Sequence, residues 1–166
     1  YMVLGHRTVP RLHPDSVVLD VIEGIVGRGQ SGWMFDEIRN KAGLAYEVGI
    51  ETAEEQDYGF FATFASVDKR NVKKTQNLIL AQLKKLQRVP AYEVEESKTY
   101  LEGSILLDNE DTQHFADELL FWEHMGDIRG FYRYLSDIQK VTVRDVQRVA
   151  KKYFTKPHTI AMIKGK

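Results

Sequence analysis

Two side chains that could bind a carbonyl group, Arg39 and Tyr46, stand seven positions apart in the sequence. A helix is expected to end near Arg39, Gly43 is suited to turn the chain, and Tyr46 would begin a strand. An arginine presents a fork of N–H donors and a tyrosine one phenolic donor, so a pair facing one cleft could hold a substrate carbonyl or a developing oxyanion. Composition and spacing alone favour the alternative, in which Arg39 forms a salt bridge with an acidic residue and Tyr46 packs.

The motifs of metal centres and nucleophilic enzymes are missing from the sequence. None of the five histidines stands in H-E-x-x-H or H-x-x-E-H, the spacings that place two imidazoles around zinc. His114 and Glu118 could share a helical face, but two ligands hold zinc poorly. The chain has no cysteine, which excludes a thiolate nucleophile and a thiolate zinc cage. Ser31 has no partner base nearby in the sequence, so we expect neither a catalytic residue nor a metal ligand in this chain.

Charge and hydropathy restrict the classes of partner. The 23 basic and 24 acidic residues give a net charge of −1, so no global field would attract nucleic acid or an anionic membrane. No apolar run approaches the roughly 18 residues that a membrane helix needs. We therefore expect no nucleic-acid partner and no membrane insertion. The sequence leaves the compartment open between cytoplasm and periplasm.

Charge is unevenly distributed along the chain. Residues 69–88 contain seven basic and no acidic residues, whereas residues 108–127 contain seven acidic residues and no Lys or Arg. This pattern is typical of solvated helix faces that partly compensate one another. The alternative is a docking surface for a partner of opposite charge. The basic segment has no interleaved aromatic residues, which argues against a nucleic-acid module.

The spacing of apolar residues, together with turn and capping residues, predicts an α+β fold. Strands and helices are segregated along the chain, so we expect a mainly antiparallel sheet with helices packed on one face. Pro14 is suited to the first position of the first helix, and Thr142 with Asp145 is close to a capping box. The expected elements are strands over 2–5, 44–53, 58–67 and 158–164, and helices over 14–26, 33–41, 69–88, 92–107, 110–125, 128–139 and 141–154.

The segment that contains Arg39 and Tyr46 resembles the second, non-catalytic domain of the pitrilysin/insulinase-like zinc metallopeptidases, which include the mitochondrial processing peptidases. The family pattern there is a glycine-rich loop, Ser-Arg-Leu-Phe, and then Phe-x-x-Ile-Arg-x-x-x-Gly-Leu-Ala-Tyr. The residues in register with it are Phe35, Ile38, Arg39, Gly43, Leu44, Ala45 and Tyr46. Looser matches over 58–61, 93–103 and 141–150 extend the resemblance to nearly the whole chain.

In that family the zinc motif H-x-x-E-H lies in the first domain of a clamshell. An Arg and a Tyr of the second domain face the zinc across the cavity and contact the substrate backbone. The resemblance therefore implies that Arg39 and Tyr46 bind peptide substrate. It also implies that this chain holds no cofactor, and that zinc belongs to a catalytic partner, either another domain of the same polypeptide or a separate subunit.

The glycine-rich loop departs from the family pattern. Gly27-Arg28-Gly29 stands where the family often has three glycines, and Gly32-Trp33-Met34 stands where it has Ser-Arg-Leu. We expect these departures to shape a different cavity wall or subunit contact.

We expect residues 1–166 to form a single domain, a fragment of such a second domain that lacks its first strand–helix–strand. An unpaired sheet edge would allow pairing with another chain, so a homo-oligomer is compatible with this interpretation. The expected function is to position peptide substrate for a zinc-dependent endopeptidase, with no hydrolysis by this domain alone. The alternative is a catalytically dead scaffold domain of the same fold, in which Arg39 and Tyr46 are merely structural.

Overall fold

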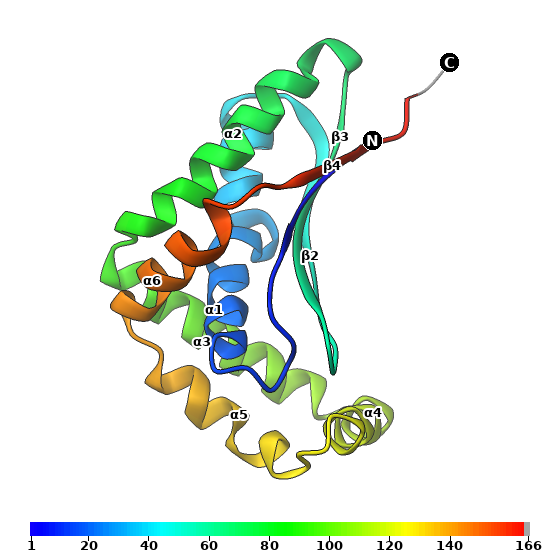
Figure 1. The fold of residues 1–166 in the computed structure, drawn as a ribbon, viewed down its shortest axis with the longest axis vertical. Helices are drawn as coiled ribbons and strands as arrows, with labels where there is room; N and C mark the ends of the chain where they lie inside the picture. The colour runs from blue at the N-terminus through cyan, green and yellow to red at the C-terminus, as the bar shows by residue number, and fades with distance from the viewer. Residues whose placement is uncertain (165–166) are drawn as a thin grey trace.

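The computed structural model describes residues 1–164 and places a layer of helices against one face of an antiparallel sheet (Figure 1). Within the described residues the sheet has four strands in the order β2-β3-β1-β4. These strands are β1 (Met2–Arg7), β2 (Ala45–Glu54), β3 (Gly59–Val67) and β4 (Thr159–Met162). All three pairings are antiparallel, which confirms the predicted fold class.

The core lies between the sheet and helix α1 (Ser16–Gly27). Alternate residues of β1 face this core, so Met2 and Leu4 are fully buried while Val3 between them is only partly covered. From α1, Ile22 and Ile25 complete the apolar contact from the helix side. Helix α1 also contacts α3, α5 and α6, so it lies at the centre of the fold.

The remaining helices surround α1 and extend beyond the end of the sheet, where α4 and α5 lie (Figure 1). A π-helix, η2, and five α-helices follow α1, and short 3-10 turns flank α2. Their bounds are η2 Phe35–Lys41, α2 Val72–Lys85, α3 Ala91–Asp108, α4 Thr112–His124, α5 Arg129–Lys140 and α6 Val143–Phe154. Among residues 1–164, no helix has the length and apolar character required to cross a membrane.

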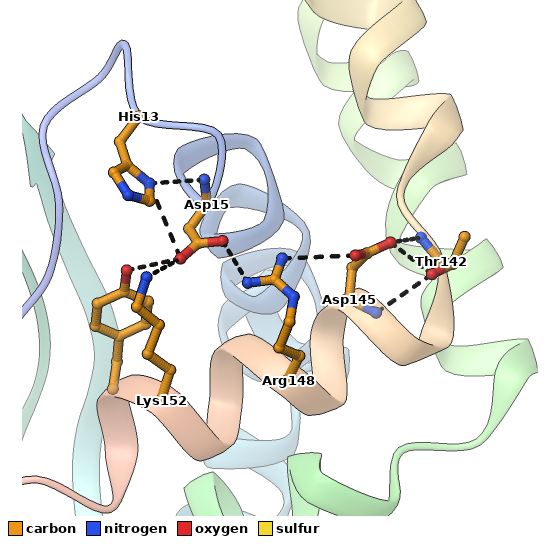
Figure 2. A network of polar contacts seen from close by, with 7 residues as sticks. His13, Asp15, Thr142, Asp145, Arg148 and Lys152 are labelled. Carbon is orange, nitrogen blue, oxygen red and sulfur yellow. Dashed lines mark hydrogen bonds and ion pairs between the residues drawn. The ribbon is translucent and has the colours of Figure 1, made fainter.

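The predicted capping box at the start of α6 is confirmed. The Asp145 backbone N–H donates to the Thr142 hydroxyl oxygen at 3.2 Å, and the Thr142 backbone N–H donates to the Asp145 carboxylate at 3.1 Å. Figure 2 shows this box beside a second cluster, in which the Asp15 carboxylate meets Arg148 and Lys152 of the same helix.

Two element boundaries differ from the prediction. Helix α1 begins at Ser16, two residues after Pro14, and the Asp15 carboxylate bonds α6 instead of capping α1. Glu54, which lies between the expected strands 44–53 and 58–67, is the last residue of β2 and is buried, where it accepts a hydrogen bond from Ser16. Sequence spacing carries no information on either of these long-range contacts.

Candidate functional site

Arg39 lies on the π-helix η2, where the backbone is wider than in an α-helix. The Ala42 N–H donates to the Glu37 carbonyl, five residues earlier, at 3.1 Å. One face of this helix is anchored by Ile38, which is fully buried, while Arg39 is exposed. π-Helices are rare and occur frequently at functional sites. The expected helix over 33–41 is therefore present, but its main part has a geometry that the sequence did not predict.

Tyr46 is presented to solvent by the turn and the strand that follow the π-helix. Gly43 adopts a φ of +60°, in the left-handed region that glycine enters at little cost. The pairing of β2 with β3 is irregular between Ala45 and Glu47, so Tyr46 stands at a β-bulge. Bulges redirect side chains, and the Tyr46 side chain is 83% exposed.

The two residues meet on this surface. The Arg39 guanidinium carbon lies 5.1 Å from the centre of the Tyr46 ring and 4.9 Å from that of Phe35, within the range of cation–π contacts. Contact with both rings restricts the guanidinium without using its N–H donors. Tyr46 and Arg39 therefore form one exposed pair of hydrogen-bond donors.

Neighbouring acidic residues do not neutralise Arg39. Asp36 and Glu37 are paired with Lys41, whose Nζ lies 2.7 Å from the Asp36 and 2.6 Å from the Glu37 carboxylate. Within residues 1–164 no ion pair involves Arg39. The alternative from composition, with Arg39 in a salt bridge and Tyr46 packed, is therefore not the arrangement in the structure. The assignment of the pair to substrate binding stays a prediction.

A shallow hollow of about 480 Å³ lies beside this pair. Residues 43–46 form one side of it, and residues 66–68, at the end of β3, form the other. Tyr46 and the residues at the end of β3 thus border the same space.

Two residues of the glycine-rich loop that precedes the π-helix, Arg28 and Trp33, bind this segment to α3. Arg28 and Trp33 both donate to the Glu93 carboxylate of α3, at 3.1 Å and 2.8 Å. Arg28 also pairs with Glu96 at 3.1 Å, and Lys85 lies 4.0 Å from the Trp33 ring centre. Arg28, Trp33 and Glu93 are buried, so they fasten the segment that enters the π-helix.

Sequence reasoning identified Arg28 and Trp33 as departures from the family pattern but missed their common partner. Glu93 is 60 residues away from Trp33, and no local signal links the two. The sequence analysis also predicted that this loop shapes a different cavity wall or subunit contact, and that stays a prediction.

The other candidate ligands and nucleophiles stand apart from this site. His114 and Glu118 share a face of α4 and border a separate hollow. Ser31 accepts a hydrogen bond from Arg28 and donates to the Arg28 carbonyl, both at 3.2 Å. In the part of the chain that the structure describes, no three His, Asp or Glu side chains are grouped as metal ligands.

Comparison with known families gives a match over residues 1–101 to the family described as the Peptidase M16 inactive domain. A curated relative, the zinc protease PqqE of Helicobacter pylori, is 27% identical over 158 residues. That alignment covers 93% of this chain but only 35% of the relative, so this chain spans about a third of the relative's length.

Solved structures share the fold. The peptidase M16 inactive domain from Pseudomonas fluorescens superposes with a TM-score of 0.78 at 20% identity, over 92% of this chain and 37% of that chain. A chain of complex III2 from Candida albicans superposes with a TM-score of 0.85 at 14% identity, over 96% of this chain and 41% of that one. The architecture is thus common to proteins of low sequence identity.

Proposed function

Because this chain belongs to the Peptidase M16 inactive-domain family, we propose that it is the substrate-binding, non-catalytic half of a zinc peptidase. Arg39 and Tyr46 bind the backbone of a peptide opposite a zinc site that another domain or subunit carries. The domain itself performs no hydrolysis.

The exposed stack of Arg39 on Tyr46 is the observation that supports this proposal most directly. A stacked guanidinium keeps its donors directed and available, so it can bind a peptide carbonyl with little loss of side-chain entropy. The Tyr46 hydroxyl supplies a second donor at the end of the ring. Zinc bound to the partner would polarise the scissile carbonyl, and the pair would hold the peptide in register with it.

The lengths of the relatives support a separate catalytic partner. This chain spans 35% of the Helicobacter pylori zinc protease, so most of that protein lies outside the matched region. The H-x-x-E-H motif does not occur in this chain. We therefore assign zinc and the activated water to the partner, and substrate positioning to this domain.

The test measures peptide cleavage by the complete protein, with the zinc-bearing half present as a domain or an added subunit. Arg39→Gln and Tyr46→Phe should each lower kcat/KM by about tenfold or more, because each removes a hydrogen bond to the substrate. Tyr46→Phe is the sharper variant, since it keeps the ring that stacks on Arg39.

Matched controls come from exposed residues outside the pair. Arg88→Gln, just after α2, and Tyr92→Phe on α3 should leave kcat/KM within twofold (about 0.4 kcal/mol) of the wild type. Unchanged kcat/KM in both Arg39→Gln and Tyr46→Phe would reject the proposal. It would favour the scaffold alternative, as would a complete protein with no zinc-dependent cleavage.

A further inference from the structure

A second hollow, of about 490 Å³, lies between the end of α3 and the facing sides of α4 and α5. Its volume falls within the range of about 300–1,000 Å³ that is usual for ligand sites. Aromatic side chains dominate the walls contributed by α4 and α5. They are Phe121, Trp122, Phe131, Tyr132 and Tyr134.

The aromatic side chains of these walls are only partly buried by the rest of the protein. Trp122 is buried and packs on Tyr134, with ring centres 5.8 Å apart, whereas Tyr132 at the rim is 75% exposed. An exposed tyrosine beside buried aromatic side chains gives a surface that is apolar within and accessible at its edge. Aromatic residues of this kind are enriched at sites where proteins bind other proteins.

The floor of the hollow carries no excess positive charge. Arg11 lies there, 5.8 Å from the Trp122 ring centre and 5.4 Å from that of Tyr134. Its guanidinium is paired with Asp20 at 2.8 Å and with Glu54 at 2.5 Å. A ligand in the hollow therefore meets a cation that is already compensated.

The rim of the hollow is acidic. Asp108 of α3 and Glu118 of α4 border it from two sides. Residues 99–128, which include α4 and the end of α3, contain eight acidic residues and no Lys or Arg. On α5, Arg133 is held in ion pairs with Asp127 and Asp137. The field at the opening therefore favours a cationic ligand.

The acidic rim and the Arg39–Tyr46 pair lie at opposite ends of β2. Tyr46 is near the start of this ten-residue strand, and the turn after its end contacts α4, where the Gln56 amide donates to the His124 carbonyl. Ten strand residues span about 30 Å. Figure 1 shows α4 beyond the bottom of the sheet, next to that turn.

Two properties of the hollow define its ligand. The aromatic walls favour apolar side chains, and the acidic rim favours a cation, so the ligand combines positive charge with accessible apolar side chains.

We propose that the hollow between α3, α4 and α5 binds a peptide segment of another protein in which Lys or Arg stands among aliphatic residues. The aliphatic side chains pack against Trp122 and Tyr132, and the cation meets Asp108 and Glu118. The charge asymmetry in the sequence is, at this place, a docking surface rather than only a solvated helix face. The site is independent of the proposed Arg39–Tyr46 function.

Binding of a fluorescent leucine–lysine peptide to the intact protein, followed by anisotropy, tests the proposal. The Asp108→Asn/Glu118→Gln double variant should weaken the affinity about tenfold. Tyr132→Ser should weaken it by a similar factor. The control Asp117→Asn/Glu123→Gln changes two exposed acidic residues of α4 that do not line the hollow, and it should change the affinity less than twofold (about 0.4 kcal/mol).

Two further peptides separate charge from apolar contact. A leucine–glutamate peptide and a serine–lysine peptide should each bind at least tenfold (1.4 kcal/mol) more weakly than the leucine–lysine peptide. The proposal is overturned by equal binding of either peptide, by equal losses in the two double variants, or by no binding at all. Self-association of the protein that Tyr132→Ser abolishes would also overturn it, because a second copy would then be the ligand. Arg39→Gln should leave the affinity unchanged.

Discussion

Asp15 and Asp20 stand five residues apart around the start of α1, and both are buried, yet their surroundings are opposite. The Asp15 carboxylate accepts hydrogen bonds from Arg148 at 2.6 Å, Lys152 at 2.7 Å and the Tyr153 hydroxyl at 2.7 Å. Figure 2 shows these donors of α6 converging on a single carboxylate. Two cations, Arg148 and Lys152, therefore pair with the single carboxylate of Asp15.

Around Asp20 the carboxylates outnumber the cations. Arg11 is shared by Asp20 and Glu54, and the Tyr134 hydroxyl donates to Asp20 at 2.7 Å. Glu23, one turn further along α1, is half-buried and accepts a hydrogen bond from Thr52 at 2.8 Å. One half-buried cation, Arg11, therefore pairs with two carboxylates, with a third acidic residue one helical turn away.

The pKa values of these groups shift in opposite directions. Burial pushes the pKa of Asp15 upward, but the hydrogen bonds from Lys152, Arg148 and Tyr153 outweigh it and hold that pKa well below its ordinary value. Burial raises the pKa of Asp20, which Arg11 only partly offsets. Burial and the nearby Asp20 charge raise the pKa of Glu54 to about 8.

The difference shows that burial alone does not decide the charge of a carboxyl group. The number of cations per carboxylate decides it, since burial opposes ionisation in both places. Asp15 is an ionised clamp between the start of α1 and α6. The raised pKa values favour a protonated carboxyl group in the Asp20–Glu54 cluster, and Arg11 compensates the charge that remains.

Of the substitutions in the two regions, removal of Arg11 should lower the free energy of unfolding the most. Arg11→Met leaves Asp20 and Glu54 buried without a cation, and we expect a loss of about 3–5 kcal/mol in the free energy of unfolding. Urea unfolding measures this loss. Adding Asp20→Asn and Glu54→Gln to Arg11→Met should recover most of it. A loss below about 1 kcal/mol in Arg11→Met would show that the cluster is not held by this cation.

Neutralising Asp15 should have a smaller effect. Asp15→Asn loses charged hydrogen bonds to α6, and we expect a loss of about 2 kcal/mol because Arg148 and Lys152 are half exposed and water screens them. The same urea experiment measures it at neutral pH. Lys151→Gln, an exposed substitution on α6, serves as the control and should be neutral. If Asp15→Asn lost as much stability as Arg11→Met, the prediction that the Arg11 cluster contributes more would be wrong.

The pH dependence of stability should distinguish the two regions with opposite signs. The folded state keeps a proton on Glu54 up to a pKa of about 8, whereas the unfolded chain releases it at the ordinary pKa of 4.5. The free energy of unfolding should therefore fall as pH rises between these values, and Glu54→Gln should flatten that fall. The depressed pKa of Asp15 acts conversely, so its stabilisation should be lost as pH falls below the ordinary value of 3.8.

Unfolding measured over the whole pH range tests both limbs. Asp15→Asn should flatten only the acid limb, and Glu54→Gln only the limb above it. If Glu54→Gln left the profile of the wild type unchanged, Glu54 would be ionised in the folded state and the contrast with Asp15 would not hold.

Features with a local cause could be predicted from the sequence. The α6 capping box needs only Thr142 and Asp145, three residues apart, and the hairpin of β2 and β3 needs only β-forming runs on either side of a polar turn. The contact of Arg39 with Tyr46 also has a local cause, since one helix end, one glycine and one strand start separate them, but composition and spacing alone favoured a salt bridge for Arg39, and only the family resemblance favoured the pair.

Features that depend on residues distant in the sequence could not be predicted. Asp15 reads as an ordinary residue before a helix, and only the fold brings Arg148 and Lys152 to it. The same holds for Glu93, which gathers Arg28 and Trp33. The π-helix is a further case, since the apolar spacing over residues 35–41 predicts a helix but does not distinguish π-helical from α-helical hydrogen bonding.

That wider turn makes the position of Arg39 depend on chain length. Each hydrogen bond of the π-helix spans one residue more than a bond of the α-helix that could replace it, so deletion of a single residue between 35 and 41 would allow ordinary α-helical bonding. Phe35, Arg39 and Tyr46 would then no longer be held in their present register, so a relative that is one residue shorter here is expected to lose the contact even where all three residues are kept.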